Sequence, residues 1–179
     1  MALPKRRTFP GGETPHAHER ESIDHALGQL PDRDPFYAWT LQELADPSTG
    51  QLLEIDLIVL GPHALYLVEI KSWPDGKLQG DSRDWRWSPG DGRPTRHYAN
   101  PYRGANHKAK VLKGRLTSID RELKSLRVEA LVLVSSKGLD PQLDRDGRLH
   151  VVTRTSFAGA VEYADYPGAH DRAAHQRLP

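Results

Sequence analysis

The sequence is short of the residues that disulfides, thiolate metal sites and membrane spans require. It has no cysteine among its 179 residues, so it can form neither disulfides nor a cysteine-ligated metal site. No apolar run approaches the length of a membrane-spanning helix, and the N-terminal MALPKRRTFPGG lacks the apolar core of a signal peptide. We therefore expect a cytoplasmic protein that has no membrane partner.

Zinc-binding motifs are also missing. The chain has nine histidines, but no HExxH motif and no Cys/His ligand spacing, so surface histidines are the better interpretation. A hydrophobic content of 37% with 27% charged residues is typical of a globular protein of one domain. We expect a flexible basic tail at residues 1–15, the domain at residues 16–165, and a polar C-terminal tail or the start of a linker at residues 166–179.

Charge is unevenly distributed along the chain, although the formal net charge is only +1. Ten acidic residues and two arginines lie between Glu13 and Asp56, whereas twelve Lys or Arg and four acidic residues lie between Arg83 and Arg127. An acidic part beside a basic part suits a protein that binds cations with one and phosphates with the other. The alternative is that the two parts attract each other within the fold.

Two segments, 51–60 and 65–71, read QLLEIDLIVL and LYLVEIK and are rich in branched apolar residues, so we expect two strands joined by a short hairpin turn. Side chains alternate across a strand, which predicts that Glu54, Asp56 and Ile58 share one face. Glu69 and Lys71 share a face for the same reason. The hairpin would then bring Asp56 and Glu69 together at the sheet surface.

Two neighbouring carboxylates repel each other and are hard to keep ionised without a cation. A hard cation such as Mg²⁺ takes oxygen ligands, lowers the pKa of a bound water and polarises a phosphoryl oxygen. Lys71 is suited to orient that water or to stabilise charge on a phosphate. The alternative is a solvated face with weak ion pairs. The apolar surroundings of both motifs disfavour it, because buried charges are costly unless paired or bound to metal.

The segment EIDLIVLGPHALYLVEIKSW, followed by WPDGKLQGDSRDWRW and ANPYRGANHKAK, resembles the nuclease-related domain (NERD) of the PD-(D/E)xK nuclease superfamily. The resemblance is strongest to the N-terminal domain of certain bacterial phage-defence serine/threonine kinases, and it extends over residues 13–155. It implies an α/β fold, a restriction-endonuclease-like mixed sheet flanked by helices. It also implies a nucleic-acid substrate, which we expect to be DNA, and a Mg²⁺ or Mn²⁺ cofactor.

The resemblance assigns roles at matching positions. Asp56 and Glu69 match the two metal-binding carboxylates, the Ile70 carbonyl matches a third ligand, and Lys71 matches the catalytic lysine. The family also has a glutamate on its first helix that reaches the metal. Glu19 is the candidate here, with Glu21 as the alternative.

The chain departs from the family in one place. Many members have a glutamine shortly after an Asn-Pro pair, but here Asn100-Pro101 is followed by Tyr-Arg-Gly. Asn106 or Lys108, one helical turn further on, could substitute. This departure concerns the substrate side of the site more than the metal.

A long helix is predicted over residues 102–123, with an apolar stripe that packs on the sheet. Lys108 lies at the edge of this stripe and is best placed to lean over the sheet. Arg103 and Lys108 could follow a phosphate backbone, or belong to an ordinary solvated face. Trp85 and Arg86 could contact bases, with Trp85 stacking on them, or Trp85 could simply cap the core.

The remaining elements complete an α/β sandwich. We expect a first helix at residues 16–30, a strand at 36–44, a strand at 128–135 buried on both faces and parallel to a neighbour, and a short helix at 155–164. Short strands near residues 77–79 and 149–153 and a polar hairpin at 85–98 fill the gaps.

Three functional hypotheses remain open. The chain could be an active nuclease, or a sensing module that reads nucleic acid or phage protein for a fused or partner kinase. It could also be a protein-interaction domain that uses its acidic first half. At this length it holds no kinase of its own, so we expect the front part of a longer polypeptide.

Overall fold

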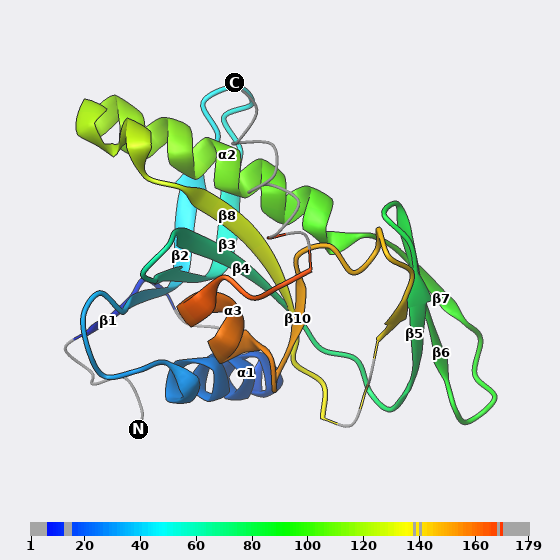
Figure 1. The fold of residues 1–179 in the computed structure, drawn as a ribbon. Helices are drawn as coiled ribbons and strands as arrows, with labels where there is room; N and C mark the ends of the chain where they lie inside the picture. The colour runs from blue at the N-terminus through cyan, green and yellow to red at the C-terminus, as the bar shows by residue number, and fades with distance from the viewer. Residues whose placement is uncertain (1–6, 13–15, 138, 140, 168, 170–179) are drawn as a thin grey trace, which may run out of the picture.

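The computed structural model describes residues 7–12, 16–137, 139, 141–167 and 169. Most of the two predicted tails therefore lies outside the described residues. The core is a six-stranded mixed sheet between two layers of helices (Figure 1). Helix α2 (Pro101–Ile119) covers one face, and α1 (Ala17–Gln29) and α3 (Phe157–Tyr163) cover the other. The predicted α/β class, a restriction-endonuclease-like mixed sheet flanked by helices, is confirmed.

The main sheet has the strand order β1-β2-β3-β4-β8-β10. Strands β2, β3 and β4 form an antiparallel meander, whereas β8 is parallel to β4 and to β10, as the continuous apolar run of β8 predicted. The strand bounds are β1 Thr8–Pro10, β2 Tyr37–Ala45, β3 Leu52–Leu60, β4 Leu65–Lys71, β8 Val128–Val134 and β10 Val151–Thr153.

A second, smaller sheet has the order β7-β6-β5-β9 and lies beside the first turns of α2 (Figure 1). Its strands are β5 Gly76–Gly80, β6 Asp84–Pro89, β7 Arg96–Ala99 and β9 Gln142–Leu143. Trp85 and Trp87 on its inner face pack with Val132 and Val134 of β8 in one apolar cluster. This cluster fixes the small sheet against the main one.

Helix α2 begins where its sequence predicts a start. The Asn100 side chain accepts a hydrogen bond from the Tyr102 N–H at 2.9 Å, and Pro101 occupies the first helical position, where no N–H is needed. The helix ends at Ile119, earlier than predicted, because the Asp120 side chain accepts from the Glu122 N–H and starts the separate 3-10 helix η2 (Arg121–Ser125). None of the helices in the described part of the chain combines the length and apolar content that crossing a membrane takes.

Two further predictions need correction. Residues 8–10, placed in the flexible tail, form β1 and pair in parallel with β2. Tyr166, placed in the C-terminal tail, is buried in the cluster beneath α1 and α3. In both cases an isolated aromatic residue was too weak a signal in polar sequence to indicate packing.

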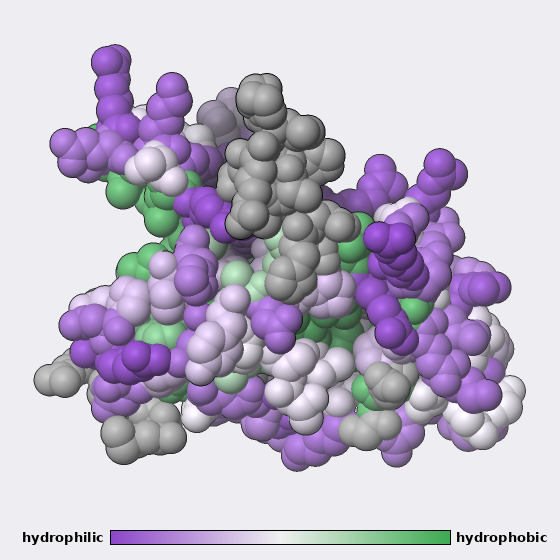
Figure 2. Space-filling view, in the orientation of Figure 1, coloured by the Kyte–Doolittle hydropathy of each residue, from purple (hydrophilic) through white to green (hydrophobic). Residues whose placement is uncertain are grey.

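The last turns of α2 extend past the main sheet. Figure 2 shows hydrophobic residues gathered beneath this end of the helix and hydrophilic residues over its outer side and over the small sheet. Ile119 at the end of α2 is 80% exposed, while Leu112 and Leu116 are only partly buried against the sheet.

Candidate active site

The candidate site lies where strands β3 and β4 separate. Their ladder runs from the pair Leu60–Leu65 to the pair Leu57–Val68 and stops there, while β4 continues beside β8 as far as Lys71. The same register would set Asp56 opposite Glu69. Asp56 Oδ2 instead accepts a hydrogen bond from the Ile70 N–H at 2.7 Å. A carboxylate therefore replaces the missing backbone partner and is held in the fork between the strands.

Strand β3 is irregular at Asp56. Its ladder with β2 has the pairs Thr40–Leu57 and Gln42–Ile55 but not the one between them, where Leu41 has a φ of 51°. A left-handed backbone is unfavourable for leucine, so the site contains local strain.

The irregularity changes which side chains share a face. Ile55 and Ile58 lie in the same cluster under α2, although a regular strand would place residues three positions apart on opposite faces. The prediction that Glu54, Asp56 and Ile58 share one face is therefore wrong. That prediction depends on side chains alternating strictly between the two faces of β3, and the alternation breaks at Asp56.

Glu69 is held by two lysines. Lys71 Nζ lies 2.8 Å from its Oε1, and Lys108 Nζ lies 2.7 Å from its Oε2. Lys71 comes from the same strand, and Lys108 leans over the sheet from α2, as its place at the edge of the apolar stripe predicted. The Glu69 side chain is only 12% exposed, so both contacts are partly shielded from water.

The pKa values of the two carboxyl groups are shifted in opposite directions. Burial, and then the charge of Glu69, raise the pKa of Asp56 to about 6, although the Ile70 N–H and the two lysines act against this. Burial also acts to raise the pKa of Glu69, but Lys71 and Lys108 outweigh it and hold that pKa below its usual value. Burial acts to lower the pKa of Lys71, and the opposing charge of Glu69 raises it overall. Glu69 and Lys71 are thus held as a charged pair beside a carboxyl group that is costly to ionise.

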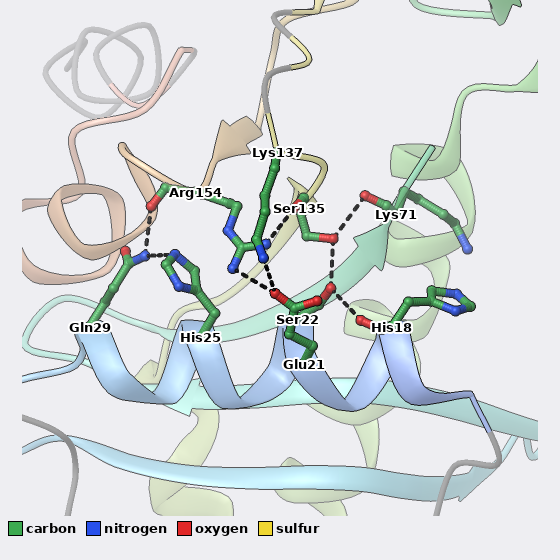
Figure 3. A network of polar contacts seen from close by, with 9 residues as sticks. All are labelled: His18, Glu21, Ser22, His25, Gln29, Lys71, Ser135, Lys137 and Arg154. Atoms are coloured by element: carbon green, nitrogen blue, oxygen red, sulfur yellow. Dashed lines mark hydrogen bonds and ion pairs between the residues drawn. The ribbon is translucent and has the colours of Figure 1, made fainter. Parts of the chain in front are cut away.

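Helix α1 approaches the site from the other face of the sheet (Figure 3). Ser22 Oγ lies 2.8 Å from Ser135 Oγ, and the Ser135 N–H donates to the Lys71 carbonyl at 2.9 Å. These contacts tie α1 to the ends of β8 and β4, and so they fix the backbone that carries Lys71.

The two glutamates proposed on the first helix separate clearly. Glu69 is the main cause of the raised pKa of Lys71, and the charge of Glu19 is a smaller contribution in the same direction. Glu21 instead pairs with Lys137 at 2.7 Å and lies 3.6 Å from Arg154 (Figure 3). Glu19 is therefore the better placed of the two.

The predicted nucleic-acid contacts differ in position. Trp85 is fully buried, so its predicted stacking on bases is wrong, and the alternative that it caps the core is correct. Arg86 is exposed on the outer face of the small sheet, and Arg103 is exposed on the first turn of α2. Their contact with nucleic acid stays a prediction. Lys113, one of the basic residues of α2, donates to three carbonyls around η2 and is a structural residue.

A cleft of about 500 Å³, which the sequence analysis did not predict, opens beside Lys71 between the two sheets. Arg93, Arg96 and Tyr98 line it together with Trp73 and Trp87. A usable signal was present in the sequence. If the hairpin register is known, Arg96 opposite Trp87 and Tyr98 opposite Trp85 must share the inner face of the small sheet.

The fork offers oxygen atoms of the kind that a hard divalent cation takes, and both oxygens of Glu69 are held by lysine ammonium groups. Asp56, Glu69 and the Ile70 carbonyl are oxygen donors, and Mg²⁺ in proteins binds to one or two carboxylates with water in its remaining positions. Within the described ranges, no group of three or more His, Asp or Glu side chains could hold a metal ion. Glu19 is thus outside the immediate donor group, and two carboxylates are what this site offers.

Comparison with known proteins shows the family of this chain. The sequence profile of the nuclease-related domain family matches residues 15–135, the segment that holds both carboxylates and both lysines. The probable kinase PglW of Streptomyces coelicolor is 36% identical over 105 residues, which are 58% of this chain and 6% of that protein. The chain therefore corresponds to a small fraction of the kinase's length. No solved structure matches it. On the strength of the profile match, the chain belongs to the nuclease-related domain family.

Proposed function

We propose that this domain is a metal-dependent phosphodiester hydrolase that acts on nucleic acid, with DNA as the substrate. The observation that carries the proposal is the fork between β3 and β4, where Asp56, Glu69 and Lys71 are brought together. Most charged residues on strands lie on solvated faces, whereas Asp56 and Glu69 are largely shielded from solvent. Burying such groups inside a sheet costs stability. Groups of this kind cluster at functional sites, which supports a catalytic role here.

In this proposal Asp56, Glu69 and the Ile70 carbonyl hold Mg²⁺ or Mn²⁺. When bound, the ion supplies a polarised phosphoryl oxygen and a water of lowered pKa. Lys71, whose raised pKa keeps it protonated, stabilises negative charge that develops on the phosphate. Lys108 takes the place of the glutamine that many family members carry, because it reaches the Glu69 carboxylate from α2. Glu19 supplies further negative charge near Lys71.

The test is cleavage of DNA by the purified protein with Mg²⁺ or Mn²⁺. Asp56→Ala should abolish cleavage, since it removes the carboxylate at the fork. Glu54→Ala is the matched control, because Glu54 is an exposed acid two positions away on the same strand. Intact DNA over a wide range of substrates, with folding confirmed by circular dichroism, would contradict the proposal.

A second candidate function is a sensing module in bacterial phage defence that controls a fused or partner kinase. One observation favours it: Lys71 and Lys108 already balance the charge of Glu69. The site is therefore compatible with binding alone, since it needs no metal ion to compensate that carboxylate. The similarity to a probable kinase supports a kinase partner. Tight, salt-sensitive DNA binding without cleavage, unchanged in Lys71→Ala, would favour this function over hydrolysis.

A further inference from the structure

The cleft beside Lys71 joins the candidate site to the small sheet. Its volume is about 500 Å³, within the range of pockets that hold a single small ligand. It is lined by Lys71 and Ser72 at the end of β4 and by Arg96, Tyr98 and Ala99 of β7. Because Lys71 also contacts Glu69, a group bound in the cleft lies next to the two carboxylates.

The pairing of β6 with β7 explains why the cleft is both basic and aromatic. Arg96 is opposite Trp87 and Tyr98 is opposite Trp85, so all four side chains project from the same face of the small sheet. Trp85 and Trp87 are buried in the core, whereas Tyr98 is half-buried and Arg96 is exposed. The lining of the cleft thus combines the buried Trp87 ring with a more accessible phenol ring and guanidinium group.

The two arginines of the cleft differ in how they are engaged. Arg93 forms an ion pair with Asp91 at 2.7 Å, and its guanidinium lies 5.9 Å from the centre of the Trp87 ring. Arg96 forms no ion pair with any residue in the described ranges. An exposed guanidinium beside aromatic rings is suited to the phosphate and the base of one nucleotide, because arginine binds phosphate through two parallel hydrogen bonds and aromatic rings stack on bases.

The size of the cleft selects between forms of nucleic acid. A duplex presents its phosphates on a wide, stiff cylinder with the bases stacked inside, so it must first unpair and unstack a base before that base can enter a cleft. An unpaired strand can turn a whole nucleotide inward, and aromatic rings then contact its base. The cleft therefore matches one unpaired nucleotide better than a duplex.

We propose that this cleft binds an unpaired nucleotide of a single-stranded nucleic acid next to the Asp56–Glu69 site, with Arg96 on its phosphate and Tyr98 against its base. This inference rests on the proposed action on nucleic acid and specifies the form of the substrate. Arg96 is then a residue that determines specificity, whereas the charge of Arg93 is already paired with that of Asp91.

The experiment measures binding without cleavage, by fluorescence anisotropy in EDTA. The probes are a short labelled oligothymidine and a duplex of the same length. Arg96→Gln should weaken binding of the single strand roughly tenfold, as expected for a lost charge-assisted hydrogen bond, and should leave duplex binding almost unchanged. Arg83→Gln is the control. It removes the same charge from an exposed position in the turn between β5 and β6 and should have little effect on either probe.

Salt dependence gives a second readout. Loss of one phosphate contact should reduce the slope of log affinity against log salt by about one for the single strand. Arg96→Lys should recover part of the affinity and of the slope, since the charge is kept but the paired hydrogen bonds are not.

Equal affinity of Arg96→Gln and Arg83→Gln for oligothymidine would overturn the inference, as would equal weakening for single strand and duplex. Neither result bears on the Asp56→Ala cleavage test. If the wild type cuts no substrate with either metal while Arg96→Gln still weakens single-strand binding, the hydrolase proposal fails and the cleft remains a binding site.

Discussion

Lys108 of helix α2 and Glu69 of strand β4 are 39 positions apart in the sequence, and Lys108 Nζ lies 2.7 Å from Glu69 Oε2. The contact crosses from the helix layer to the sheet and is partly buried. It makes the position of α2 part of the candidate site, because one of the two positive charges on Glu69 comes from the helix.

Replacing Lys108 tests this contact. Lys108→Gln should lower the free energy of unfolding by about 1–3 kcal/mol in EDTA, since a shielded carboxylate loses a charged partner. Lys110→Gln, an exposed lysine on the same helix, should change it by less than about 0.5 kcal/mol. Urea denaturation at neutral pH measures both. Equal stability of the two variants would show that Lys108 does not stabilise Glu69.

The raised pKa of Asp56 predicts a pH dependence in metal-free buffer. Its pKa is 3.8 in the unfolded chain and about 6 in the fold. The folded state therefore holds the proton more tightly, and the associated stability is present below pH 4 and lost as the pH rises through 6. Asp56→Asn, which keeps an oxygen for the Ile70 N–H, should stabilise the protein by about 2 kcal/mol at pH 8 and by almost nothing at pH 4.

The measurement is the difference in unfolding free energy between Asp56→Asn and the wild type from pH 4 to pH 8, with EDTA present. A difference that stays constant over this range would mean that Asp56 ionises in the fold as easily as in the unfolded chain.

Leu41 provides a test of the strain beside Asp56. A β-branched residue tolerates the left-handed backbone less well than leucine, so Leu41→Ile should destabilise the fold by about 1–2 kcal/mol even though the volume is the same. Leu53→Ile, in the regular part of β3, is the control and should have little effect. Thermal unfolding of both variants gives the comparison. If Leu41→Ile is as stable as Leu53→Ile, the strain is relieved by local rearrangement.

Lys113 should act as a structural residue despite its charge. Its ammonium group donates to the carbonyls of Leu123, Lys124 and Leu126 and so holds η2 and the residue after it to α2. Lys113→Met should lower the unfolding free energy by about 1–3 kcal/mol and speed amide hydrogen exchange around η2. Its affinity for DNA should fall no more than that of Lys110→Met. A larger fall would assign Lys113 to the nucleic-acid surface instead.

Much of this site follows from sequence alone because its signals are local. Alternating and continuous apolar runs identify β3, β4 and β8, and Asn100-Pro101 identifies the start of α2. The edge position of Lys108 on an apolar stripe is likewise a property of one helix. These features need no knowledge of distant contacts.

The remaining features depend on contacts between distant segments. The break in alternation at Asp56 depends on the left-handed conformation of Leu41 in the neighbouring strand, for which a leucine gives no signal. The burial of Trp85 depends on β8 packing against the small sheet. The cleft exists only because the hairpin register turns Arg96 and Tyr98 toward Lys71.

The central claim is that Asp56 and Glu69 together bind a divalent cation. Calorimetric titration of Mg²⁺ and Mn²⁺ into the wild type, Glu69→Ala and the exposed-acid control Glu54→Gln measures it most directly. The account predicts binding of one ion by the wild type and by Glu54→Gln, and its loss in Glu69→Ala. Equal heats for all three proteins, or no binding by a folded wild type, would contradict it.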